Sequence, residues 1–150
     1  MAELKRWAKM KAAILGLICV VLLSACWQRR TACVYELPTG FSGWVLIEFE
    51  RPDAPPLTKK DGKLIFRIGS DGRLATSSSP EFGVATDEYY FVGSARTKIP
   101  MTAWGGGGLV WGESNGSTQS GGKTLHVFQN FFVGTEIAYK SSATARPEPK

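Results

Sequence analysis

Nucleophilic catalysis by a serine or cysteine needs an imidazole beside the nucleophile, and the 150-residue sequence contains a single histidine, His126. His126 lies between Leu125 and Val127 in an alternating run typical of a strand, where we expect a structural or surface side chain. A zinc site is not expected for a similar reason. One histidine and Cys33, the lone cysteine beyond residue 26, cannot complete a tetrahedral set of ligands. The residue types therefore predict no such catalytic pair, no metal and no cofactor.

Paired carboxylates are the remaining side chains suited to acid–base chemistry. Glu48 and Glu50 are two positions apart on an expected strand, which places their side-chain bases ~7 Å apart on one face. Such a pair can act on a glycosidic bond or hold calcium, although solvated charges on a strand face are the more common explanation. Asp87 and Glu88 form a second acidic pair, to which we assign no role. We expect a protein without enzymatic activity and keep a carboxylate-dependent hydrolase as the alternative.

Two tryptophans stand out as candidate binding residues. Trp104 and Trp111 bracket the four glycines at positions 105–108. Aromatic side chains bury a large area with few rotatable bonds, so two indoles on a glycine-rich segment can form a contact edge for a partner. The alternative is that both tryptophans fold inward as core residues.

Two motifs of nucleotide and ester chemistry are incomplete. The run Gly121-Gly122-Lys123-Thr124 is similar to the end of a phosphate-binding loop, but Ser117 stands where that pattern needs a glycine. The segment that follows is typical of a strand, whereas a phosphate-binding loop precedes a helix. Ser42 lacks the second glycine of a nucleophile elbow, because Trp44 occupies that position. The sequence therefore predicts no nucleotide binding.

The first residues have the layout of a helical signal peptide. A basic start is followed by an apolar run of 12 residues, which is shorter than the roughly 20 residues that span a bilayer core. The tetrad Leu23-Ser24-Ala25-Cys26 resembles the lipobox of bacterial lipoproteins. That resemblance implies cleavage between Ala25 and Cys26, and attachment of acyl chains such as palmitate at Cys26, so that lipid holds the mature chain on a membrane. An uncleaved helical anchor or a plain secretory signal is the alternative.

The net charge of +5 depends strongly on this leader. Removal of its four basic residues and one acidic residue leaves 14 basic and 12 acidic side chains, a net charge of +2. The remaining positive charges are scattered along the chain. We therefore expect no nucleic-acid partner.

The rest of the chain consists of short alternating runs broken by Gly, Pro, Asp and Ser, a pattern that favours β-strands. Asp71-Gly72 should form a tight hairpin turn between paired strands at 64–68 and 73–76, because glycine supplies the positive φ that such turns need. Further strands are expected at residues 33–37, 44–50, 88–92, 109–111, 125–133 and 136–139, and loops at residues 51–62, 93–108 and 112–122. Seven or eight strands suit one small antiparallel β-sandwich, with Cys33 buried as a small hydrophobic residue. A disulfide between the Cys33 residues of two chains is the alternative.

This pattern divides the chain into four parts. Residues 1–25 are the signal peptide, residues 26–31 a short lipidated tether, residues 32–140 the β-sandwich domain and residues 141–150 a disordered tail. The tail is assigned to disorder because it carries two prolines and no large apolar residue.

A family resemblance covers much of the expected domain. The segments that carry it are Pro38-Thr39-Gly40-Phe41-Ser42-Gly43-Trp44-Val45, Gly72-Arg73-Leu74-Ala75-Thr76-Ser77-Ser78, Gly83, Asp87-Glu88-Tyr89-Tyr90-Phe91-Val92 and Phe131-Phe132-Val133-Gly134-Thr135. Together they resemble a bacterial family of uncharacterised domains, domain of unknown function 6843. The resemblance implies a protein that is secreted or lipid-anchored, and it adds no catalytic residue.

We therefore expect a lipid-anchored cell-envelope protein with a non-catalytic binding or structural domain, whose partner is an envelope protein or a glycan. The alternative is a carboxylate-dependent envelope hydrolase. Trp27 follows Cys26 where inner-membrane lipoproteins of enteric bacteria typically carry aspartate. This favours the outer membrane in a cell with two membranes, and otherwise the outer face of the plasma membrane.

Overall fold

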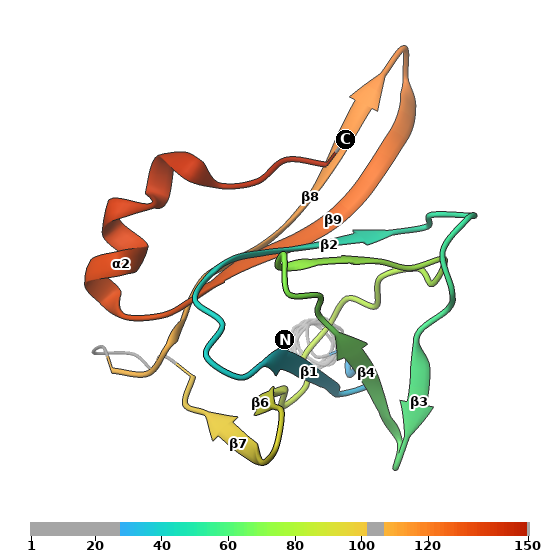
Figure 1. Ribbon diagram of the computed structural model, residues 1–150. Coiled ribbons are helices and arrows are strands. Elements are labelled where there is room, and N and C mark those ends of the chain that lie inside the picture. Colours follow the sequence, from blue (N-terminus) through green and yellow to red (C-terminus); the bar gives the residue numbers. More distant parts are fainter. Residues whose placement is uncertain (1–27, 102–106, 150) are drawn as a thin grey trace, which may run out of the picture. The chain divides into compact units, whose positions relative to one another are not determined.

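The computed structural model describes residues 28–101 and 107–149. The chain divides into two compact units. In the smaller unit, the described residues are 28–30 and Phe82–Val84, which a parallel bridge between Arg29 and Val84 joins. A larger unit comprises the rest and contains every strand and helix named below (Figure 1). The signal peptide expected at residues 1–25, Cys26 and Trp104 lie outside the described residues.

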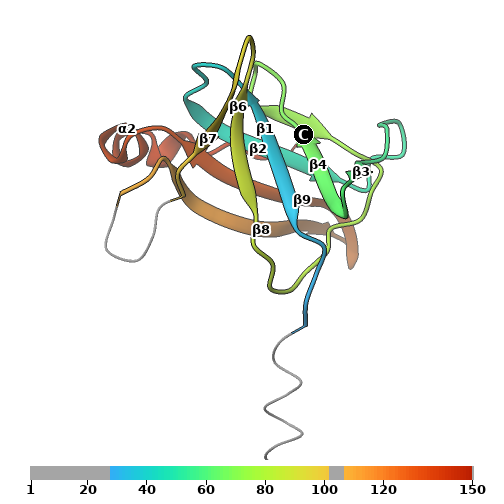
Figure 2. The same ribbon diagram turned by 90° about the horizontal axis from the view of Figure 1, so that it is seen from below.

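Nine strands in the described residues form two sheets, so the predicted all-β class is confirmed. The five-stranded sheet has the order β3-β4-β1-β6-β7, and the four-stranded sheet has the order β5-β2-β9-β8. The strands are β1 (Cys33–Pro38), β2 (Gly43–Phe49), β3 (Thr58–Lys60), β4 (Lys63–Arg67), β5 (Arg73–Ala75), β6 (Glu88–Val92), β7 (Arg96–Ile99), β8 (Val110–Ser120) and β9 (Lys123–Val133). Figure 2 looks onto the five-stranded sheet, with the four-stranded sheet behind it.

Both sheets are mixed, which differs from the purely antiparallel sandwich of seven or eight strands that the sequence predicts. β1 runs parallel to both of its neighbours, β4 and β6, and β2 runs parallel to β5. These pairs arise because the chain passes to the other sheet after β1 and again after β4. Alternation of apolar residues determines which face of a strand is buried, but it does not specify the neighbouring strand.

The hydrophobic core lies between the two sheets. Tyr35 on β1 stacks on Tyr89 of β6, with ring centroids 4.6 Å apart, and meets Phe131 of the opposite sheet edge to face at 5.3 Å. Burial raises the pKa of both tyrosines, and the Tyr35 hydroxyl donates a hydrogen bond to Gln129 Oε1 at 3.1 Å. Cys33 is buried in the same core, as expected. The core therefore joins residues from both sheets into one packed layer.

The sequence contains two Asp-Gly pairs. The structure forms a hairpin at Asp61-Gly62, whereas the sequence predicts one at Asp71-Gly72. Asp61 and Gly62 have φ of 51° and 76° and join β3 to β4, whose end residues Lys60 and Lys63 are paired. This is the backbone geometry of a type I′ hairpin turn. The loop expected at residues 51–62 therefore ends in a β-hairpin.

Asp71-Gly72 forms a turn but not the predicted hairpin, because β4 and β5 belong to different sheets. The Gly72 N–H donates to Gly69 O at 3.0 Å, and Gly72 has φ of 77°. The turn instead packs against β2, where the Leu46 N–H donates to Gly72 O at 2.9 Å. Turn chemistry predicted the backbone conformation correctly and the strand pairing wrongly.

The polar segment expected to be a loop at residues 112–122 is mostly strand β8. It pairs with β9 through a two-residue turn at Gly121 and Gly122, which have φ of 57° and 78°. β8 lies at the edge of its sheet, so only its first residue, Val110, is buried and the apolar alternation that marks a strand is missing. β7 likewise occupies part of the loop expected at residues 93–108.

The strand expected at residues 136–139 is instead a helix, α2 (Glu136–Ser141). The Thr135 hydroxyl caps it by accepting from the Ala138 N–H at 3.3 Å, and Lys140 pairs with Glu136 at 2.7 Å. Tyr139 packs on Trp44 and Phe132, which lie on the face of the four-stranded sheet that points away from the core. The helix therefore covers aromatic side chains on that outer face.

The sequence predicts a disordered tail from residue 141, and the structure differs. A 3-10 turn, η1 (Ala143–Ala145), follows α2, and the Trp44 indole N–H donates to Ser142 O at 2.9 Å. The Arg146 guanidinium lies 4.8 Å from the centroid of the Trp44 ring. These contacts depend on the folded sheet, so the polar composition of the segment does not reveal them.

Candidate functional site

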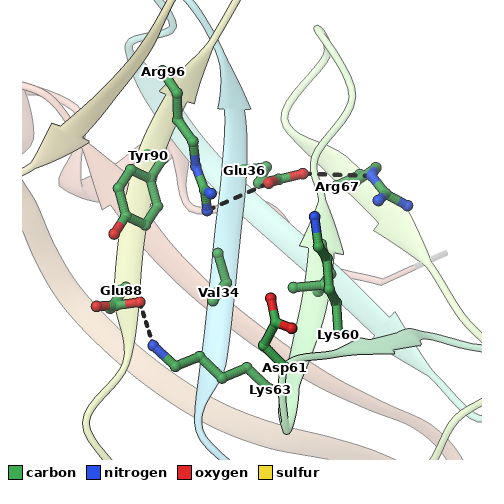
Figure 3. Close-up of a pocket in the computed structure, with 10 residues that line it drawn as sticks. Val34, Glu36, Lys60, Asp61, Lys63, Arg67, Glu88, Tyr90 and Arg96 are labelled. Carbon is green, nitrogen blue, oxygen red and sulfur yellow. Dashed lines mark hydrogen bonds and ion pairs between the residues drawn. The ribbon is translucent and has the colours of Figure 1, made fainter.

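A charged cavity lies on the outer face of the five-stranded sheet (Figure 3). Its volume is about 180 Å³. The lining residues come from five strands and the β3–β4 turn and are Val34, Glu36, Lys60, Asp61, Lys63, Ile65, Arg67, Glu88, Tyr90 and Arg96. Because side chains alternate along a strand, the same strands direct Tyr35, Phe66 and Tyr89 into the core and these charged residues outward.

Glu36 on β1 lies between two arginines from different strands. Its carboxylate is 3.4 Å from Arg67 Nε and 3.5 Å from Arg96 Nη2. Arg67 is the residue paired with Glu36 across the β1–β4 register, whereas Arg96 reaches over from β7. Two positive charges therefore hold one partly exposed carboxylate.

Glu88 on β6 is held in a similar way by two lysines. Lys63 Nζ donates to Glu88 Oε2 at 2.6 Å, and Lys98 Nζ lies 3.7 Å from Oε1. The hydrogen bond from Lys63 lowers the pKa of Glu88 below its ordinary value and raises the pKa of Lys63. Both groups stay ionised near neutral pH, so Glu88 is unsuited to act as a general acid there.

Arg96, at the top of the cavity in Figure 3, is held by an aromatic ring. The Arg96 guanidinium lies 3.9 Å from the centroid of the Tyr90 ring, within the range of a cation–π interaction. Val34 and Ile65 line the same cavity, and both are buried. The site thus has an apolar base beneath ordered charges.

Positive charge exceeds negative charge on this face. Five cations, Lys60, Lys63, Arg67, Arg96 and Lys98, face three carboxylates, Glu36, Asp61 and Glu88, which gives a net charge of +2. Within the described chain, Lys60 has no carboxylate at ion-pair distance, although it lines the cavity. The arrangement is suited to binding an anionic group through several cations.

The carboxylates predicted as a pair are not brought together as expected. Glu48 is 9% exposed and contacts Arg51 at 2.9 Å and Arg73 at 3.8 Å. Glu50 follows the last residue of β2 and has φ of 57°, so the alternation that would place it on the face of Glu48 is broken. The prediction that one strand carries both carboxylates is therefore wrong, because β2 ends at Phe49. In the second acidic pair, Asp87 accepts from the Cys33 N–H at 2.9 Å.

Trp111 lies on β8 and is half-buried. Its indole N–H donates to Gly134 O at 2.9 Å, and its ring stacks on Tyr139 of α2 with centroids 5.8 Å apart. His126 is a half-buried residue of β9 opposite Thr118. Neither side chain lines the charged cavity, and the role of Trp111 in partner binding stays a prediction.

Sequence reasoning missed Glu36, Arg67 and Arg96 because each comes from a different strand, and their meeting depends on parallel pairing. The available signal was the positive charge at alternate positions in Arg96 and Lys98. No helix of the described residues is long and apolar enough to cross a membrane. The same residues contain no group of three or more His, Cys, Asp or Glu side chains placed to hold a metal ion.

Comparison with known proteins supports the fold and identifies the family. A crystal structure of a protein from Bacillus anthracis named "Putative Lipoprotein" is similar, with a TM-score of 0.60 and 24% sequence identity over 80% of this chain and 82% of that one. A search of curated proteins found no match. The sequence matches a family of unknown function, DUF6843, over residues 29–142, most of the chain. The chain therefore belongs to the DUF6843 family.

Proposed function

We propose that this protein is a lipid-anchored protein of the cell envelope that binds an anionic partner through the charged cavity of the five-stranded sheet and catalyses no reaction. The observation that carries the proposal is the pairing of each central glutamate with two cations from neighbouring strands. Such an arrangement keeps several cations ordered before a ligand arrives, which reduces the entropy lost on binding.

The lipid anchor is proposed from the tetrad Leu23-Ser24-Ala25-Cys26, with cleavage before Cys26 and acylation of its thiol. The name of the structurally similar Bacillus anthracis protein is consistent with it. Two or more acyl chains hold a protein durably on a membrane, whereas one does so only marginally. The domain then meets its partner at the membrane surface, on the outer membrane of a two-membrane cell or on the outer face of a plasma membrane.

The partner is proposed to carry phosphate or carboxylate groups, as anionic glycans and acidic protein segments of an envelope do. An anion entering the cavity can share Arg67 and Arg96 with Glu36, and it can take Lys60 as a further partner. Arginine suits this role because its planar guanidinium can form two parallel hydrogen bonds to such a group.

Binding of inorganic polyphosphate by the full chain in detergent micelles tests the proposal. Arg96→Gln should weaken binding about threefold to tenfold, since one charge-assisted contact is lost. Glu36→Gln should strengthen binding, because it releases two arginines from an internal competitor. Lys123→Gln, at the exposed first residue of β9, is the matched control for loss of one positive charge and should have little effect.

Two outcomes would contradict the proposed site. If Lys123→Gln weakens binding as much as Arg96→Gln, polyphosphate responds to net charge alone. If Glu36→Gln leaves the affinity unchanged, the cations around that carboxylate do not contact the anion.

A further inference from the structure

The edges of the two sheets differ sharply in how they are protected. Exposed edge strands can pair with other chains, and proteins commonly prevent this with short strands, Lys side chains or Pro. Three edge strands follow that rule: β3 and β5 have 3 residues each, β7 has 4, and each contains Lys or Arg. The fourth, β8, has 11 residues and contains no Lys, Arg or Pro, and its only irregularities are two register shifts against β9, between Trp111 and Ser114 and between Thr118 and Gln119.

The first part of the β8 edge already has neighbours. Val110 forms an isolated bridge with Met101, and the Arg146 guanidinium donates to Gly112 O at 3.2 Å and to Ser114 Oγ at 3.3 Å. From Asn115 onward, the described chain places no further strand beside β8 opposite β9. Pro147 and Glu148 line one cavity with Asn115 and Gly116, and the β8–β9 register shifts between Thr118 and Gln119. Figure 1 shows this outer end of the β8–β9 hairpin projecting beyond β2. Alternate backbone N–H and C=O groups there point away from β9.

The sequence of this open segment is complementary to itself. A two-fold axis at Ser117 places Ser117 opposite its own copy, Gly116 opposite Thr118, and Asn115 opposite Gln119. Serine, threonine, asparagine and glutamine side chains each contain both a donor and an acceptor, so these pairs need no opposite charges. The same operation on β3 would bring the lysines of two copies together.

We propose that two copies of this chain pair along β8 through antiparallel residues 115–119, joining two four-stranded sheets into one continuous eight-stranded sheet. Five residues from each copy form a small interface, so the association is weak and increases with concentration. The charged cavity lies on the other sheet and takes no part, so the proposal stands independently of the anionic partner.

Cysteine crosslinking of the full chain in membranes tests both the pairing and its register. Directly opposed residues of an antiparallel pair have Cα atoms about 4.5–5.5 Å apart, a separation that a disulfide can span. Ser117→Cys should therefore form a disulfide-linked dimer under mild oxidation. Gln119→Cys is the matched control on the same exposed strand, because the two-fold axis separates its copies by about 14 Å at ~3.4 Å per residue. Asn115→Cys together with Gln119→Cys should restore crosslinking.

Sedimentation of the full chain in detergent provides a second measurement. Ser117→Lys places two like charges at the axis and should weaken self-association at least tenfold, whereas Ser141→Lys on α2 should not change it. Equal crosslinking of Ser117→Cys and Gln119→Cys would indicate random collision and overturn the proposal. A full chain that stays monomeric up to about 1 mM, with no crosslink at position 117, would overturn it as well.

Discussion

Substitution of Gly72 by alanine tests the packing of the turn between the two sheets. At φ of 77°, a residue other than glycine costs ~1–2 kcal/mol. An added Cβ would also lie 2.4 Å from Trp44 O, a backbone atom of β2 that cannot move without displacing the strand. Overpacking of this kind costs ~1–3 kcal/mol, so Gly72→Ala should lower the free energy of unfolding by about 2–5 kcal/mol in total.

Gly40→Ala is the matched control, because this substitution introduces the strain of a positive φ without a steric clash. Gly40 has φ of 78°, and no atom lies within 4 Å of its added Cβ. We therefore expect a loss of only ~1–2 kcal/mol there. Urea unfolding of the full chain in detergent, followed by tryptophan fluorescence, measures both variants under the same conditions. Equal losses at the two glycines would refute the argument that the turn packs closely on β2.

The remaining predictions concern the anchor, the ion pairs, the aromatic cluster and catalysis. Cys26→Ala should abolish palmitate labelling of the full chain, and persistent label would contradict the lipid anchor. The lowered pKa of Glu88 contributes stability that is complete above the unfolded value, ~4.3, and is lost as the pH falls through the folded value. Glu88→Gln should therefore flatten the acid part of a stability profile, while an identical profile would refute the ion-pair contribution. Trp111→Ala should reduce the stability by ~2–4 kcal/mol in urea unfolding, since it removes a ring stack and a hydrogen bond; unchanged stability would instead support an exposed contact role. Turnover of peptidoglycan fragments that disappears in Glu48→Gln would show that the protein is an enzyme.

The candidate site could be predicted only in part. The sequence places Asp87 and Glu88 together as an acidic pair, but the structure separates their roles, because Glu88 contacts two lysines and Asp87 accepts from the Cys33 backbone. Glu36 gave no signal by itself, since its two arginines lie far away in the sequence. An ion-pair cluster assembled across strands becomes visible only when the strand order is known.

The sequence by itself determined the all-β class and the buried faces of the strands. In β2, alternate residues Val45, Ile47 and Phe49 enter the core as their spacing predicts, and Cys33 is buried as expected. The conformation at Gly72 also followed from local chemistry, because glycine readily adopts positive φ. These features depend on residues that are close together in the sequence, and so does the lipobox pattern that predicts the anchor.

Only the tertiary structure decided which strands are neighbours. Asp61-Gly62 and Asp71-Gly72 offer the same turn chemistry, yet one closes a hairpin and the other crosses between sheets. The two-residue period of a strand determines the face of each side chain and contains no information on the adjacent strand. Parallel pairing of β1 with β4 and β6, which brings Glu36 beside Arg67, instead depends on burying the core between two sheets. The charged cavity therefore results from long-range packing, which local sequence patterns do not specify.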